Sequence, residues 1–259
     1  MAARSAGLME SMSVYVFSNE YQIGKTLCDL RNFPRSKQPA VHVGVSGWQN
    51  YDMALCRRNE YMVLIDANPM ENYLHKITEE VLLVAKDVDD FVDLIVPKLR
   101  ASQLACPFGT EEYIRNRKAY WLQDRERFEK IQNMFKEKRV VINVLNYADT
   151  AMVEKLQKFL PKSWNLSLED IDTFYVSNVG EWLGPTWHYE NYRQNLMQLF
   201  QVTNRKMITV YATKENLPVL SDLKARTVIL SRGCVVSKMT TSCPSEVFPN
   251  ICSRYNCSH

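Results

Sequence analysis

The sequence predicts an α/β fold with a mostly parallel sheet and helices on both faces. Short apolar runs rich in β-branched residues alternate with longer stretches of helical periodicity, as in strands joined by helical crossovers. Polar residues gather just after the apolar runs, where strands would end. With 259 residues, 46% hydrophobic and 24% charged, the chain has the composition of a globular protein.

The strands are predicted from composition and from turn residues at their ends. The run at residues 61–66 (YMVLID) is apolar almost throughout, as expected of a strand covered on both faces. Further strands are expected at residues 13–17, 41–45, 140–145, 171–176, 206–212 and 227–230. We expect the strand at 41–45 to lie between those at 61–66 and 171–176, with the strand at 140–145 also in this group.

Helix starts are marked by capping residues. Asn19 and Gln22 form an N-cap and third-position pair that opens a helix to about Arg31. Asn68 followed by Pro69 combines an N-cap with a proline at the first helical position, so a helix is expected to begin there.

A long amphipathic helix is expected at about residues 111–138. Trp121, Phe128 and Phe135 lie on one stripe of it. Because this helix is longer than a crossover requires, we interpret it as an insertion whose stripe packs back on the domain and is mostly buried.

The chain is divided into an N-terminal extension (1–37), a main α/β domain (38–232) with the helical insertion at about 101–138, and a cysteine-rich C-terminal strand or tail (233–259). The four cysteines of the tail are separated by eight, eight and four residues, whereas zinc ligands usually come in pairs two to four residues apart. We therefore expect ordinary thiols and no metal site at Cys234, Cys243, Cys252 and Cys257.

Charge and hydropathy exclude some classes of protein. A formal net charge of +3 is small for this length and gives no clear signal for a nucleic-acid partner. No apolar run approaches the roughly 18–20 residues needed to span a bilayer, and the N-terminus lacks the apolar core of a signal peptide. A cytoplasmic protein is the expectation.

The predicted site lies where the strands end. Open parallel sheets bind ligands at the carboxyl ends of their strands, at the point where the strand order switches. Asp66 follows Gly44 by 22 residues, the spacing expected of a glycine turn and a ribose-binding acid. The non-apolar residues at these strand ends are Gly44, Ser46, Gly47, Asp66, Asn68, Asp149, Ser177 and Asn178.

Each of these residues also has a structural explanation. The glycines fit a tight turn, Asp149 fits an N-cap, and Asn178 could simply close a turn. The conjunction of several polar strand ends favours a functional site.

This pattern resembles the class I S-adenosylmethionine-dependent methyltransferases over residues 38–232. That family has a glycine loop after its first strand, an acid ending the second, a polar residue after the third and a substrate motif after the fourth. The matching positions are 43–47 (VGVSG), Asp66, 146–149 (NYAD) and 177–180 (SNVG). The sequence departs from the family at His42, which replaces an acid, and lacks the third glycine and the prolines of the fourth motif.

The resemblance implies S-adenosylmethionine as the cofactor. Gly44, Ser46 and Gly47 would face its methionine moiety, Asp66 and the neighbouring Asn68 its ribose, and Asp149 its adenine. Near the methyl acceptor, which the sequence leaves open, the resemblance implies catalytic roles for Asn178, His188 and Tyr189 and substrate contacts for Trp182 and Trp187.

Two alternatives remain. One is a catalytically degenerate Rossmann-like binding or scaffold module, because the glycine loop is eroded. The other is a nicotinamide-dependent oxidoreductase, whose G-x-G-x-x-G fingerprint requires glycines where Ser46 and Gln49 stand.

Asp66 gives the most specific structural expectation. Asn68 can cap the following helix, so the acid is not needed for that role. We expect its carboxylate to point into an open cleft beside the turn at residues 44–47, with no lysine or arginine partner.

Overall fold

The computed structural model describes the main body of the chain and parts of its two ends. The described residues are 14–17, 23–34, 39–102, 104–106, 108–177, 179, 183, 187–203, 207–213 and 227–231.

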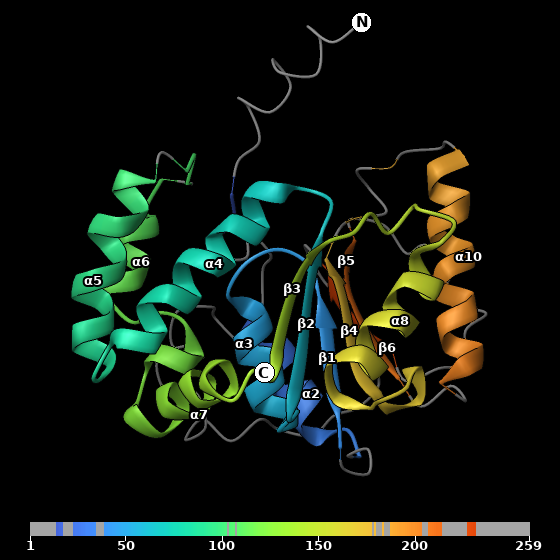
Figure 1. Cartoon of the computed structure of the whole chain (residues 1–259), viewed down its shortest axis with the longest axis horizontal. Helices are drawn as coiled ribbons and strands as arrows, with labels where there is room; N and C mark the ends of the chain where they lie inside the picture. Colours follow the sequence, from blue (N-terminus) through green and yellow to red (C-terminus); the bar gives the residue numbers. More distant parts are fainter. Residues whose placement is uncertain are drawn as a thin grey trace, which may run out of the picture.

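Six parallel strands form one sheet in the order β3-β2-β1-β4-β5-β6 (Figure 1). β1 lies between β2 and β4, as expected, and β3 pairs with β2. This is the strand order of Rossmann folds. The strands are β1 (Val41–Gly44), β2 (Tyr61–Asp66), β3 (Val140–Val144), β4 (Ile171–Ser177), β5 (Ile208–Thr213) and β6 (Thr227–Ser231).

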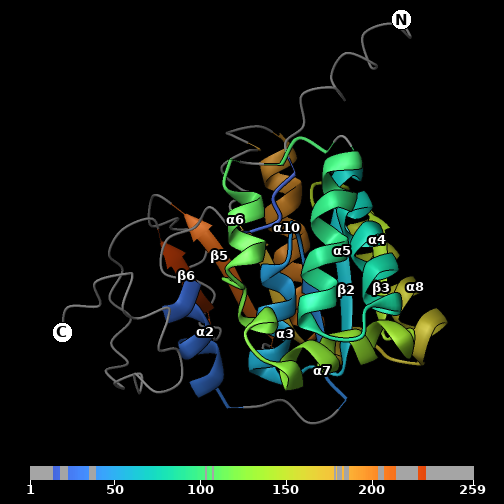
Figure 2. The ribbon, with the colours of Figure 1, turned by 90° about the vertical axis from the view of Figure 1, so that its left-hand side faces the viewer.

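Helices cover both faces of this sheet, and Figure 1 shows α4 to α7 on one side and α8 and α10 on the other. Figure 2, turned by 90°, shows α2 beside β6 at the far edge. The helices are α2 (Ile23–Asn32), α3 (Gln49–Arg57), α4 (Pro69–Val84), α5 (Val88–Ala101), α6 (Thr110–Arg115), α7 (Arg125–Lys136), α8 (Met152–Trp164) and α10 (Trp187–Val202), with short 3-10 turns η1 (Tyr120–Leu122) and η2 (Leu168–Asp170).

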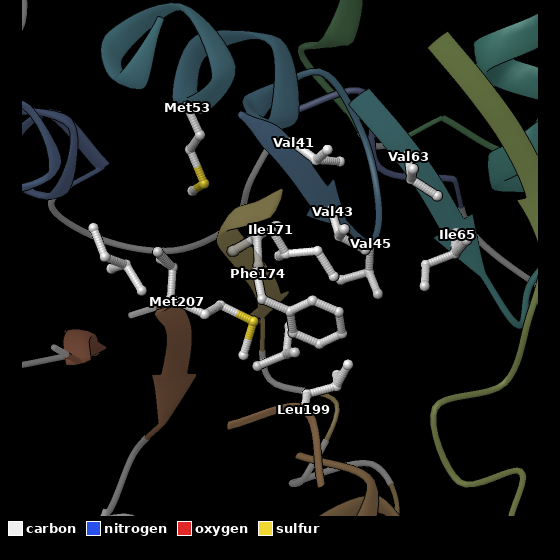
Figure 3. Packing of buried hydrophobic residues seen from close by; sticks show 14 of the residues in the cluster. Val41, Val43, Val45, Met53, Val63, Ile65, Ile171, Phe174, Leu199 and Met207 are labelled. Carbon is white, nitrogen blue, oxygen red and sulfur yellow. The ribbon is translucent and has the colours of Figure 1, made fainter. Parts of the chain in front are cut away.

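Two apolar clusters hold the layers together. In the first, alternate residues of β1 and β2 meet Phe174 and Leu199 (Figure 3). The second cluster is formed largely by helices α3 to α7. In it, the rings of Trp48 and Trp121 pack edge to face with their centroids 5.3 Å apart. Because both faces of β2 are buried, its side chains are apolar almost without interruption.

The prediction of a single long helix at residues 111–138 is wrong. The segment forms α6, η1 and α7, and the chain turns at Arg117, which has a φ of 47°. Asp124 then starts α7 by accepting a hydrogen bond from the Arg127 amide at 2.9 Å. The periodicity continued through this break because the apolar residues of all three pieces face the same core.

The burial of the apolar stripe is confirmed. Trp121, Phe128 and Phe135 all lie within the second cluster. Asp52 of α3 accepts the Trp121 amide at 2.8 Å and so fixes the insertion to the helix that follows β1.

The prediction of a strand at residues 13–17 is also wrong for residues 14–17, which the structure describes. Residues 14–17 make scattered hydrogen bonds to Ala105, Glu71 and Trp48 and pair with no strand, although Val14 and Val16 are fully buried. We call residues 14–17 the N-terminal segment. The expected caps Asn19 and Gln22, and the tail cysteines, lie outside the described residues.

Two further absences concern the described part of the chain. None of its helices is long and apolar enough to cross a membrane. It also holds no group of three or more histidine, cysteine or acidic side chains that could bind a metal ion.

Candidate functional site

The strand order puts the switch point between β1 and β4. The chain passes from β1 through β2 to β3 on one side, and then crosses back to β4 on the other. In open α/β sheets this is where ligands bind, at the carboxyl ends of the strands. Ser46 follows β1 there, and Ser177 ends β4.

Backbone strain marks these same two serines. Six non-glycine residues of the described chain have positive φ, and four of them follow the ends of helices, where this conformation is common: Arg58, Arg117, Lys138 and Asn165. Ser46 (φ 64°) instead follows β1, and Ser177 (φ 49°) is the last residue of β4. Such strain costs of order 1–3 kcal/mol per residue and clusters at functional sites.

Asp66 lies beside the turn after β1, as expected. Its Oδ2 accepts the Ser46 amide at 2.9 Å and its Oδ1 accepts the Asn68 amide at 2.8 Å. Burial raises the pKa of this carboxyl, and these backbone hydrogen bonds partly offset the rise. No hydrogen bond or ion pair with a lysine or arginine is found for it within the described chain.

The Asp66 carboxylate is more enclosed than expected. The residue is only partly exposed, and both of its carboxylate oxygens already accept backbone amides. The Ala67 amide also stabilises this carboxylate, which has about four acceptor positions in all, so part of its acceptor capacity remains for a ligand.

The glycines of the turn are explained by internal contacts. A Cβ on Gly44 would lie 1.8 Å from Asn50 Oδ1, and one on Gly47 would lie 1.8 Å from the Tyr15 carbonyl oxygen. The Trp48 amide, at the start of α3, donates to the Val16 carbonyl at 3.0 Å. The N-terminal segment thus covers the amide of the N-cap residue that precedes α3.

Buried polar side chains fix the shape of the turn. Asn50 Nδ2 donates to the carbonyls of Val45 and Gly47 at 2.7 and 2.8 Å. His75 Nε2 lies 2.7 Å from the Ser46 carbonyl, and its Nδ1 lies 2.7 Å from the Tyr51 hydroxyl. Burial lowers the pKa of His75 to about 4, so the ring is neutral at pH 7 and donates from Nε2 to the carbonyl.

Asn68 and Asp149 act as caps. Asn68 Oδ1 accepts the Met70 amide at 3.0 Å, and Asp149 Oδ1 accepts the Ala151 amide at 2.9 Å. Asp149 also pairs with Lys155, which holds the pKa of its carboxyl below the usual value.

The residues expected near the methyl acceptor are only partly described. Asn178 and Trp182 lie outside the described residues. Trp187, His188 and Tyr189 form the first turn of α10, where Trp187 is exposed.

Helix α10 is joined to the loop after β3. Asn195 Nδ2 donates to the carbonyls of Tyr147 and Asp149, both at 2.8 Å, and Asn191 Nδ2 donates to Ala148. This attachment brings the element that carries His188 toward the loop expected to face adenine.

Unpartnered buried atoms gather at this end of the sheet. Seven side-chain polar atoms of the described chain are buried without a hydrogen-bond partner. Four of them lie in the loop or the first helical turn that follows β1, β2 or β3: Gln49 Oε1, Glu71 Oε2, Asn72 Oδ1 and the Tyr147 hydroxyl. Such groups are rare in proteins and call for an explanation, such as a bound ligand or water.

The negative charge of Asp66 contributes to raising the pKa values of two of these groups, Glu71 and Tyr147. Burial, and then the nearby Asp66, raise the pKa of Glu71 to about 8 despite a hydrogen bond from the Tyr15 amide. Burial, followed by the influence of Asp66, Tyr192 and Tyr175, raises the pKa of Tyr147 well above its usual value. Sequence reasoning missed both, although Glu71 is the third residue of a helix that starts at a candidate site.

A protein-family model described as Domain of unknown function (DUF7790) matches residues 15–106 and 109–227. No curated protein matches the chain.

Proposed function

We propose that this chain, which belongs to the DUF7790 family, binds S-adenosylmethionine at the carboxyl ends of β1, β2 and β3 and acts as a methyltransferase. The methyl acceptor is a small molecule or a protein group that enters from the side of α10.

The unpartnered acceptors carry this proposal. Gln49 Oε1 and Asn72 Oδ1 are buried acceptors without a partner in the described chain, and an amide oxygen cannot donate. The carboxylate of Asp66 already accepts two backbone amides but is likewise an acceptor only. A buried polar group without a partner costs about 1–3 kcal/mol, so a ligand that supplies donors gains this energy on binding. S-adenosylmethionine offers an ammonium, two ribose hydroxyls, an adenine amine and a positive sulfonium.

The same surroundings disfavour a dinucleotide. A pyrophosphate is normally held by the free amides at a helix N-terminus, but here the N-terminal segment packs on the turn before α3, where Val16 accepts the amide of the N-cap residue Trp48. Ser46 and Gln49 stand where the nicotinamide fingerprint has glycines.

The roles of the residues follow from these positions. Asp66, fixed by the Ser46 and Asn68 amides, would orient the ribose through its remaining acceptor capacity. Tyr147 would offer its hydroxyl at the same end of the sheet. When bound, the cofactor supplies an electrophilic methyl group, and the protein aligns it with the acceptor and excludes water.

The acceptor side rests on the resemblance. Asn178 and Tyr189 would hold the nucleophile and His188 would take its proton, with Trp182 and Trp187 packing on the substrate. Asp149 would accept from the adenine amine in addition to its capping bond.

A binding or scaffold module without catalysis is the second candidate. It is favoured by the contact between the N-terminal segment and Gly47, because this glycine serves internal packing. In that case the strained serines and unpartnered acceptors would hold a ligand or water that is not consumed.

Calorimetric titration with S-adenosylhomocysteine, NAD and ATP in parallel tests the proposal. We expect binding of S-adenosylhomocysteine and at least tenfold weaker binding of the two anionic nucleotides. Preference for NAD or ATP would overturn the proposal, and binding of none of the three would leave the scaffold function in first place. Glu154→Gln, which removes an exposed charge on α8, is the matched control for changes at Asp66.

A further inference from the structure

We infer that Gln49 is an ammonium-binding residue, whose Oε1 accepts a hydrogen bond from the amino-acid end of the ligand. The inference rests on the proposed function, because it assigns one end of the same ligand to a particular residue of the site.

Gln49 occupies a position where its amide must be used. It is the first residue of α3 and is 3% exposed, so water does not solvate it freely. Its Nε2 donates to the Tyr175 hydroxyl at 3.4 Å, while Oε1 has no partner in the described chain. The amide nitrogen of Gln49 therefore has a hydrogen-bond partner, whereas the amide oxygen is an acceptor that receives no hydrogen bond from the described residues.

The surrounding contacts place this acceptor at the switch point. The Val45 amide donates to the Tyr175 carbonyl at 3.1 Å, which ties the end of β1 to β4. The turn that begins at Val45 then leads through Ser46, Gly47 and Trp48 to Gln49. Gln49 and Tyr175 thus flank the turn on the side of β4, whereas Asp66 holds it from the side of β2.

This arrangement predicts which end of the ligand lies where. Asp66 contacts the Ser46 amide, and Gln49 follows three residues later, so a ligand held by Asp66 through its sugar can extend past Ser46 to Gln49. The group arriving there must donate a hydrogen bond. An ammonium fits best, because hydrogen bonds to charged groups stabilise a complex about twice as much as neutral ones.

The experiment compares two probes that differ in this end alone. S-adenosylhomocysteine carries the amino-acid end, and 5′-methylthioadenosine lacks it while keeping the adenosine part. Affinities of the wild-type protein, Gln49→Met, Gln49→Glu and Tyr175→Phe are measured by calorimetry, with thermal unfolding as the check on folding.

Gln49→Met keeps the length of the side chain but removes the acceptor. We expect S-adenosylhomocysteine to bind roughly 10- to 100-fold more weakly and 5′-methylthioadenosine to change less than about twofold. Gln49→Glu keeps an acceptor and adds a negative charge, so we expect it to retain S-adenosylhomocysteine binding within a few fold of wild type.

Tyr175→Phe provides a second variant if Gln49→Met does not fold. Without the hydroxyl that holds Nε2, the amide is free to turn, and we expect a smaller loss of S-adenosylhomocysteine affinity, again with no loss for 5′-methylthioadenosine.

Several outcomes overturn the inference. Equal losses for both probes would show that Gln49 has only a structural role, and no loss for either would show that it does not contact the ligand. A Gln49→Glu protein that binds S-adenosylhomocysteine worst of all would mean that the amide faces the ligand as a donor. Wild-type protein that binds neither probe contradicts the proposed function itself, and this inference falls with it.

Discussion

Two buried polar networks lie at opposite ends of the same sheet, and they differ in how completely their hydrogen bonds are made. At the amino end, Arg57 of α3 makes two hydrogen bonds of 2.7 Å to Asp172 of β4. Asn59 donates to the same carboxylate at 3.2 Å and accepts from Thr173 at 3.3 Å. The chain of contacts continues to His42, whose Nδ1 lies 2.7 Å from Thr173 Oγ1.

None of the side chains in this amino-end network has an unpartnered buried atom. At the carboxyl end, Gln49, Glu71, Asn72 and Tyr147 each have one. Satisfied buried networks fix a fold, whereas a group of unsatisfied acceptors has a cost that only a ligand or water can remove. The comparison therefore separates residues that hold this protein together from residues that we expect to bind.

Asp172→Ala tests the amino-end network and should have the largest effect. Removing the carboxylate leaves the fully buried Arg57 guanidinium without its ion partner, and breaking such a pair costs about 3–5 kcal/mol. Urea denaturation of this variant and of Glu154→Gln as control measures the loss. A change below about 1 kcal/mol would show that the network does not hold β4 to α3.

The pH dependence of stability tests Glu71. Its pKa of about 8 in the folded protein lies above the usual 4.5, so the folded state binds a proton that the unfolded state releases. The stability it contributes is full below pH 4.5 and is lost as pH rises through 8. From pH 6.5 to 8 we expect a loss of about 2 kcal/mol from this group.

Glu71→Gln isolates this contribution. The amide resembles the protonated acid and can still accept the Tyr15 amide, so the variant should match wild type only below about pH 4.5. It should already be more stable than wild type at pH 6.5, and its advantage should grow by about 2 kcal/mol between pH 6.5 and 8. The window avoids His42 and His75, whose pKa values burial lowers to about 4. Asp52, with a pKa of about 7, adds a pH dependence that is the same in both proteins. If the free energy of unfolding varied with pH in parallel for the two proteins, Glu71 would not be the source of the loss.

Asp66→Ala separates binding from folding at the carboxyl end. We expect at least tenfold weaker binding of S-adenosylhomocysteine, because the two ribose hydroxyls of the ligand lose their charged acceptor. Thermal unfolding should also show a cost of about 1–3 kcal/mol, since the Ser46 and Asn68 amides lose their acceptors. Unchanged affinity would remove Asp66 from the site and leave it as a residue that only shapes the turn.

Asp149→Asn should have the smallest effect. Its carboxylate is engaged with the Ala151 amide and with Lys155 at the surface, and asparagine can still cap the turn. We expect S-adenosylhomocysteine affinity to fall less than about threefold in calorimetry. A loss as large as that of Asp66→Ala would mean that Asp149 contacts the adenine more directly than its capping role indicates.

Much of the fold was accessible from the sequence because its strands are short, apolar and bounded by clear turn residues. The places of β1 to β4 and the position of β1 between β2 and β4 were predicted in this way. The break between α6 and α7 was missed because Trp121, Phe128 and Phe135 kept a helical spacing through it. The candidate site was predicted only as a region.

The sequence by itself determined the alternation of strands and helices, the capping at Asn68 and the collection of polar residues where strands end, because these depend on neighbours along the chain. Only the tertiary structure decided how those residues are used. Gly47 is needed because Tyr15 crosses it, and Asp66 is turned inward because the Ser46 and Asn68 amides reach it. Whether Gln49 Oε1 finds a donor depends on contacts between distant segments, and no local pattern encodes them.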